Sequence, residues 1–252
     1  MNVFAFWSIS LRLTAAVVLA GMIVRRGWAA GADNSAQAWA CRPAPVQLPQ
    51  GFDPERIYLA SRPSLLPDGK QFLFEWCDAI WIAPIEGGVA KVLQHSAGKD
   101  AWPVVSRDGK RFAFQSSRAG GWHLFVATLE EGAEARQVAF NSEAERPYLW
   151  SLDDRELLCF VYRDDVGSAF DQGRLAWIPV DRRAAERRLF DAPGSEPALS
   201  PDGRYVLFTQ EGEDLYRKGF EGENASRIWC YDTQTQAFSL VVKHPSESRT
   251  PL

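Results

Sequence analysis

The stretch ALSPDGRYVLFTQ, residues 198–210, holds a short apolar segment, a Pro-Asp-Gly turn and a second apolar segment. The chain repeats this phrase with small changes in three earlier places: SLLPDGKQFLFEW from Ser64, VVSRDGKRFAFQS from Val104 and LWSLDDRELLCFV from Leu149. The four turn aspartates follow one another at intervals of 40, 45 and 49 residues: Asp68, Asp108, Asp153 and Asp202. This period matches the roughly 40–50 residues of a four-stranded propeller blade.

Each repeat predicts the same series of strands. A proline precedes a short first strand, and the turn follows, where glycine can adopt positive φ; these prolines are Pro63, Pro103, Pro147 and Pro197. An apolar strand comes next, then an aromatic one such as AIWIAPI from Ala79, and then a fourth strand. Apolar residues at successive positions, as in YVLF of 205–208, predict strands buried on both faces, which neighbouring blades would provide.

We therefore predict an all-β fold, a β-propeller of four-stranded blades over residues 51–252, with blades at about 62–101, 102–145, 146–195 and 196–249. No stretch of this region has helical spacing. A β-sandwich is the alternative, although it would not need one turn phrase at a fixed period. Because propellers close with about four to eight blades, four repeats predict an incomplete arc of a six- or seven-bladed ring, with a fifth repeat beginning near Pro251.

The N-terminus predicts a targeting segment. The uncharged apolar run LTAAVVLAGMIV, residues 13–24, is much shorter than the roughly 20 residues that span a bilayer. Ala30 and Ala32 supply the small residues of a signal-peptide cleavage site. Residues 1–32 therefore predict a signal peptide, and the protein is expected to be periplasmic or secreted.

An uncleaved anchor is the alternative for this segment. Arg25 and Arg26 follow the apolar run, where positive charge opposes translocation, and the apolar residues 3–7 extend the run backwards. Residues 33–50 are rich in proline, alanine and polar groups and predict a linker.

The composition is that of a globular domain, with 46% apolar residues, 24% charged residues and a formal net charge of −4. The absence of a basic excess argues against nucleic-acid binding. Of the four cysteines, Cys77, Cys159 and Cys230 fall in or beside different predicted strands, without a Cys-x-x-Cys pair. We predict buried free thiols that pack as small apolar side chains.

The sequence contains no recognisable catalytic or cofactor motif. His95, His123 and His244 stand without a serine or cysteine motif such as G-x-S-x-G, and metal-ligand spacings and phosphate-binding glycine loops are missing too. The acidic pairs Asp153-Asp154 and Asp164-Asp165 lack the pattern of a calcium loop and are interpreted as solvated turns. We therefore expect surface histidines or hydrogen-bonded structural ones, no cofactor and no metal.

Two groups of residues are the candidates for special roles. The turn residues are expected to be structural, because aspartate in such turns bonds its own backbone; they are Asp68, Gly69, Asp108, Gly109, Asp153, Asp202 and Gly203. The third repeat has Leu152-Asp153-Asp154 in place of Pro-Asp-Gly, so its turn is expected to adopt another geometry. The insertion 216–224 exceeds what a blade requires, and its Tyr216, Arg217, Lys218 and Phe220 predict a contact loop, with packing on a neighbouring blade as the alternative.

The phrases LSPDGRYVLF at 199–208 and DAIWIAPIEGGVAKVL at 78–93 resemble the TolB/PD40-type, WD40-like propeller repeat. Within that superfamily the chain is most similar to the N-terminal propeller of tricorn-like proteases of the S41 serine peptidase family. The insertion YRKGFEGENASRIWCYD at 216–232 resembles a Y-R-K-x-Y-x-G-S…I-W-x-Y-D segment of that family's fourth blade. The likeness covers about residues 52–252.

This resemblance implies a non-catalytic propeller of an exported tricorn-like protease, which scaffolds the enzyme and gates the access of peptide substrates. The family continues into further blades, a PDZ domain and a catalytic domain, so its catalytic residues match no position in this chain. The implied partners are peptides or proteins. A TolB-like periplasmic interaction protein and the propeller cap of a prolyl-oligopeptidase-type hydrolase are the alternatives.

Overall fold

The computed structural model describes residues 24–25, 60–141, 144–162, 173–210, 225–244 and 248–251. Regular structure within these ranges consists of strands alone, as the repeats predict. None of these residues forms a helix long and apolar enough to cross a membrane. The predicted signal peptide, the linker and the insertion 216–224 lie almost wholly outside the described residues.

The strands form four antiparallel four-stranded sheets, in each of which strands close in sequence are neighbours. The first blade contains β2 (Ser61–Leu65), β3 (Gln71–Trp76), β4 (Ala79–Pro84) and β6 (Lys91–Gln94). The second contains β7 (Asp100–Val105), β8 (Arg111–Ser116), β9 (His123–Thr128) and β10 (Arg136–Gln137). The third contains β11 (Glu145–Trp150), β12 (Glu156–Val161), β13 (Arg174–Pro179) and β14 (Arg187–Arg188). The fourth contains β15 (Ser195–Leu199), β16 (Tyr205–Gln210), β17 (Arg227–Asp232) and β18 (Ala237–Leu240).

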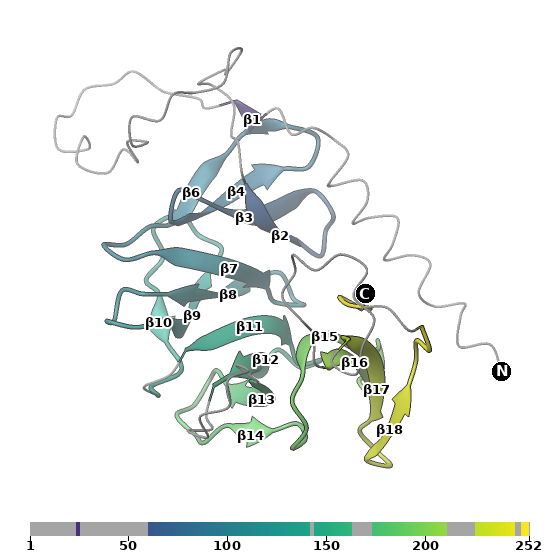
Figure 1. The fold of residues 1–252 in the computed structure, drawn as a ribbon. Coiled ribbons are helices and arrows are strands. Elements are labelled where there is room, and N and C mark those ends of the chain that lie inside the picture. The colour runs from purple at the N-terminus through teal and green to yellow at the C-terminus, as the bar shows by residue number, and fades with distance from the viewer. Residues whose placement is uncertain are drawn as a thin grey trace, which may run out of the picture.

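The four blades follow one another around an arc (Figure 1). The first strand of each blade is the inner one, and β2 contacts β7, β7 contacts β11, and β11 contacts β15. A short parallel pair, β1 (Val24–Arg25) with β5 (Gly88–Val89), joins the edge of the first blade. The chain therefore has the propeller architecture predicted from its repeats.

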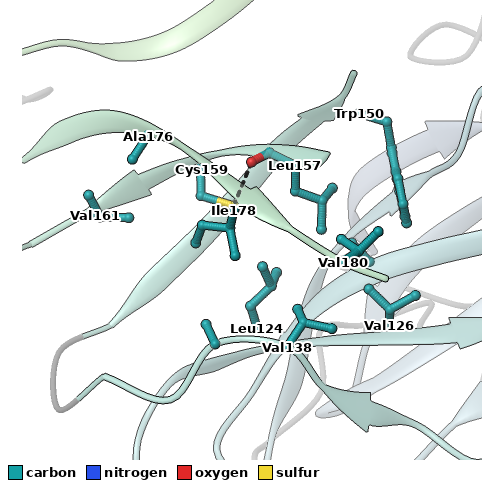
Figure 2. Close-up of a cluster of buried hydrophobic side chains, with 12 residues drawn as sticks. Leu124, Val126, Val138, Trp150, Leu157, Cys159, Val161, Ala176, Ile178 and Val180 are labelled. Atoms are coloured by element: carbon teal, nitrogen blue, oxygen red, sulfur yellow. Dashed lines mark hydrogen bonds between the residues drawn. The ribbon is translucent and has the colours of Figure 1, made fainter. Parts of the chain in front are cut away.

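The hydrophobic core is divided into layers between successive blades. One cluster joins the first and second blades through residues such as Leu73 and Phe112, and another joins the third and fourth through Leu158 and Phe208. Figure 2 shows the layer between the second and third blades, where Leu124 and Val126 face the third blade. Because each sheet packs on both faces, the second strands carry buried residues at successive positions, as in β8 and β12, where every residue after the first is buried. This explains the unbroken apolar runs of the sequence.

One backbone hydrogen bond recurs at every seam, as we name the boundary between one blade and the inner segment that follows it. The residue before the third strand of a blade offers its carbonyl oxygen to an N–H near the start of the next inner segment. The four bonds are Asp100 N to Asp78 O at 3.0 Å, Glu145 N to Trp122 O at 3.2 Å, Gly194 N to Gly173 O at 3.3 Å and Ser248 N to Ser226 O at 2.8 Å. The fourth bond brings residues 248–251 to the place that an inner strand occupies in the other blades.

The repeated prolines lie inside the inner strands rather than before them. In β2, β7 and β15 the strand register shifts around the residue–proline pair, which forms a bulge: Arg62-Pro63, Trp102-Pro103 and Glu196-Pro197. Proline, which lacks an N–H, is tolerated at bulges and on edge strands. In β11 the shift instead falls between Pro147 and Leu149, so Pro147 is not the counterpart of the other three prolines.

Candidate functional site

The four predicted turns lie where the inner strands end. We name this side of the blades the turn face. The residue after the turn aspartate has positive φ, 68° at Gly69 and Gly109 and 73° at Gly203. Its N–H donates to the carbonyl three residues earlier, as Gly109 does to Ser106 at 3.0 Å. The aspartate carboxylate in turn accepts the N–H two residues onward, as Asp68 does from Lys70 at 2.9 Å. These contacts are the local backbone bonds expected of such an aspartate.

A serine hydroxyl supports three of the turn aspartates. Ser106, Ser151 and Ser200 donate to the carboxylates of Asp108, Asp153 and Asp202 at 2.7, 2.7 and 2.6 Å. These hydroxyl donors are the main cause that holds the pKa of each carboxyl below its ordinary value. Because the folded-state pKa is lowered, the stabilisation is present at neutral pH and is lost as the pH falls through that pKa.

The expectation of a different geometry for the third turn was wrong. Asp154 takes the place of glycine with φ of 55°, and its N–H donates to Ser151 O at 3.1 Å, as in the other turns. Its carboxylate reaches the second blade, where it accepts the N–H groups of Arg107 at 2.8 Å and Asp108 at 2.9 Å. Asp154 is also buried rather than solvated. Two charge-assisted hydrogen bonds therefore compensate a backbone conformation that aspartate tolerates better than most residues.

Replacing Asp154 by glycine tests this contact. Glycine relieves the positive φ, a gain of up to about 1 kcal/mol, but leaves two amides of the neighbouring turn without their acceptor. We expect a net loss of about 1–3 kcal/mol in the free energy of unfolding, measured by urea denaturation. Asp153→Asn at the exposed neighbouring position is the matched control and is expected to cost less. A more stable Asp154→Gly variant would show that the contact between the turns contributes nothing.

The structure places the remaining predicted residues as follows. Tyr216, Arg217, Lys218 and Phe220 of the predicted contact loop lie outside the described residues. His95 and His244 are exposed, whereas His123 is buried at the start of β9, with its Nδ1 3.5 Å from the carboxylate of Glu145.

Cysteine burial was predicted correctly for only one of three positions. Cys159 is fully buried in β12, with its Sγ 3.7 Å from the carbonyl oxygen of Leu157. Cys77 and Cys230 form no disulfide and are only half-buried. Cys77 occupies the tight turn between β3 and β4 with φ of 50°, and Cys230 lies in the outermost blade of the arc, where no further blade covers β17 among the described residues.

The side of the blades opposite the turn face, where the inner strands begin, is the candidate functional site. We name it the proline face after the residue–proline pairs located there. Arg62, Trp102, Glu196 and Thr250, each followed by proline, have φ between 51° and 55°. Positive φ in such residues is uncommon, costs about 1–3 kcal/mol and concentrates at functional sites. Bulges also redirect side chains.

Trp102 is the centre of the proline face. The guanidinium carbon of Arg62 lies 3.4 Å from the centroid of its ring, and that of Arg146 lies 4.3 Å from it. Tyr148 contacts the same indole edge-on, with ring centroids 6.1 Å apart. Three inner strands, β2, β7 and β11, thus contribute to one aromatic and cationic cluster.

Burial affects the ionisation of this cluster. It is the main cause that lowers the pKa of Arg62 and raises that of Tyr148. Glu75 offsets part of the effect at Arg62, since their side chains approach to 3.9 Å. The same carboxylate accepts the N–H of Trp102 at 2.9 Å and the hydroxyl of Ser61 at 2.6 Å. Glu75 therefore binds the second blade to the first.

A cavity of about 260 Å³ lies beside Trp102, between the second and third blades. Its walls are largely aromatic, with hydrogen-bond donors from an arginine and an amide; they consist of Trp102, Gln115, Trp122, Ala144, Arg146 and Tyr162. Concave sites that combine apolar rings with a few polar groups are the usual form of a ligand site. Sequence reasoning missed this cavity, although the Trp-Pro and Arg-Pro pairs marked two of its residues.

Three comparisons relate the chain to known proteins. The family model of the tricorn protease N-terminal beta propeller domain matches residues 59–252. Tricorn protease homolog 1 of Streptomyces coelicolor is 26% identical over 166 residues, which are 65% of this chain and 15% of that protein. The chain therefore spans only a small part of the length of this relative.

Solved structures show the same fold. The putative TolB of Agrobacterium tumefaciens has a TM-score of 0.61 at 19% identity, over 77% of this chain and 65% of that one. The crystal structure of the tricorn protease has a TM-score of 0.57 at 17% identity, over 77% of this chain and 19% of that one. The four blades thus cover only part of each of these two structures.

Proposed function

The chain belongs to the family of tricorn protease N-terminal β-propeller domains, and from this premise we propose that it is the non-catalytic propeller portion of an exported tricorn-like S41 protease. In this role the blades support the protease and gate the access of peptide substrates. Export rests on the apolar run 13–24 and the small residues that follow it. The partners are peptides and the protease domains of the parent protein.

The proline face is the observation that carries the gating role. The inner strands place Arg62, Trp102 and Arg146 in one cluster beside an aromatic cavity. Aromatic rings and arginine are the groups that contribute most to peptide and protein recognition. The turn face differs, because its carboxylates and amides bond to one another within and between the turns.

Photo-crosslinking tests this proposal. A benzoylphenylalanine in place of Trp102 is expected to capture peptides from a mixed pool, because peptides would pass over the proline face. The same group in place of Leu152, an exposed residue of the turn face, is the matched control and is expected to capture several-fold less. Mass spectrometry of the adducts gives both yields.

The same preparation also tests the absence of catalysis. The purified 252-residue chain is expected to leave the peptide pool uncleaved. Turnover that persists after contaminating proteases are removed, or equal capture at positions 102 and 152, would contradict the proposed function.

A further inference from the structure

The N–H of the residue before proline has a side-chain acceptor at three seams of the arc. Trp102 N donates to Glu75 of the preceding blade at 2.9 Å. Glu196 N donates to the hydroxyl of Tyr148. Thr250 N donates to the hydroxyl of Thr209 at 3.2 Å and to Glu196 at 3.0 Å. Each bulge is thus fastened to the blade before it.

The seam between the second and third blades lacks this bond. Pro147 stands six residues before the turn aspartate Asp153, as Trp102 stands six before Asp108, so proline occupies the position of the bulge N–H. Proline has no N–H to donate. The strand register shows that Gln115 is the side chain that loses this partner. Gln115 lies opposite Ala101, just as Glu75 lies opposite Ser61 and Thr209 lies opposite Ser195.

Gln115 consequently lacks the backbone partner that Glu75 and Thr209 have. Its residue is only 7% exposed, and its side chain makes no hydrogen bond with any residue that the structure describes. An amide without a protein partner can both donate to a ligand and accept from it. Gln115 lines the 260 Å³ cavity together with Trp102, Trp122 and Tyr162.

We infer that this cavity is a subsite for one residue of a bound peptide, in which the Gln115 amide pairs with the N–H and the carbonyl of that extended residue and the aromatic rings hold an apolar side chain. The inference rests on the proposed function and names the part of the substrate that this site recognises. The ligand's N–H takes the place of the backbone N–H that Pro147 cannot supply, and its carbonyl accepts from the Gln115 amide.

The chemistry of the walls favours a peptide group. A primary amide offers both a donor and an acceptor, as a peptide group does. Arginine and tryptophan supply donors only, so Arg146 and the two tryptophans complement the carbonyl oxygens of a peptide. The volume is below the roughly 300–1,000 Å³ of sites for drug-sized ligands, which suits a single residue.

Backbone methylation of a peptide provides the test. Ac-Ala-Ala-Leu-Ala-Ala-NH2 and the same peptide with N-methyl-leucine are titrated into the 252-residue chain and into its Gln115→Leu variant, with the dissociation constant read by calorimetry. Methylation and the substitution are each expected to weaken binding about three- to tenfold, the range of one net hydrogen bond. Applied together, they are expected to weaken it no further, because both remove the same bond.

Three controls separate the explanations. Gln137→Leu, on the outer strand β10, is expected to leave binding unchanged. A peptide with alanine in place of leucine is expected to bind less tightly, because it leaves the aromatic walls uncovered. The free-acid form of the leucine peptide tests whether Arg146 instead anchors a carboxylate.

The outcomes distinguish the inference from the function on which it rests. If no peptide binds, the proposed function and the subsite both fail. If peptides bind but methylation acts equally in the wild type and in Gln115→Leu, the subsite alone is overturned. A free acid that binds far more tightly than the amide, regardless of methylation, would also overturn it and would assign the cavity to a carboxylate.

Discussion

Replacing Arg118 by methionine lowers the free energy of unfolding by about 3–5 kcal/mol, the cost of breaking a buried ion pair from one side. Arg118 donates to both carboxylate oxygens of Asp100 at 3.0 Å, and the Asp100 side chain is fully buried. The substitution leaves that carboxylate without its cation in the seam between the first two blades. Methionine keeps apolar contact with Phe114 and Phe125, over which the guanidinium lies at 5.2 and 5.0 Å.

An exposed ion pair at the same seam is the matched control. Lys99 and Asp78 approach to 3.8 Å with side chains 63% and 56% exposed, so Lys99→Met is expected to cost only about 0–1 kcal/mol. Urea denaturation followed by circular dichroism gives both values, and Arg118→Lys, which keeps a cation, is expected to fall between them. Equal effects of Arg118→Met and Lys99→Met would show that burial of Asp100 does not matter.

Replacing Trp150 by alanine is the second change with a large expected effect, a loss of about 3–5 kcal/mol. Trp150 is 2% exposed and fills the layer between the second and third blades (Figure 2). Its Nε1 donates to the carbonyl of Val104 at 2.9 Å, so the substitution also removes this hydrogen bond. Both the cavity and the lost hydrogen bond act at the interface of two sheets.

Two further variants check this explanation. Trp150→Phe keeps most of the apolar volume but cannot donate, and it is expected to cost about 1–3 kcal/mol. Trp81→Ala, at a half-buried position of the first blade, is expected to cost less than Trp150→Ala. If Trp81→Ala is as damaging, the layer between the second and third blades is not a principal source of stability.

The repeat explains why the fold could be predicted from the sequence. Four copies of one turn phrase fix the number of blades, and the apolar runs fix which strands are buried on both faces. The third turn was mispredicted because its φ depends on a partner distant in sequence: Asp154 is held by the amides of residues 107 and 108. Local turn chemistry does not contain that information.

The candidate site was harder to predict, for a related reason. The cluster of Arg62, Trp102 and Arg146 depends on the bulges at Arg62 and Trp102, and sequence spacing alone does not reveal a bulge. One signal was available: Pro147 lies six residues before its turn aspartate, whereas Pro103 lies five before its own. That extra residue is what leaves Gln115 without its backbone partner.

The bridge from Asp154 to the preceding turn has a consequence for shuffled versions of this protein. Its carboxylate completes the hydrogen bonding of Arg107 and Asp108, while the corresponding residue of the fourth repeat, Gly203, has no side chain to do so. A copy of the fourth repeat in third place would leave these two amides without a hydrogen-bond acceptor. The repeats are therefore not interchangeable. Recombination that preserves the order of the second and third repeats keeps the hydrogen bonds between their turns, and recombination that alters this order removes them.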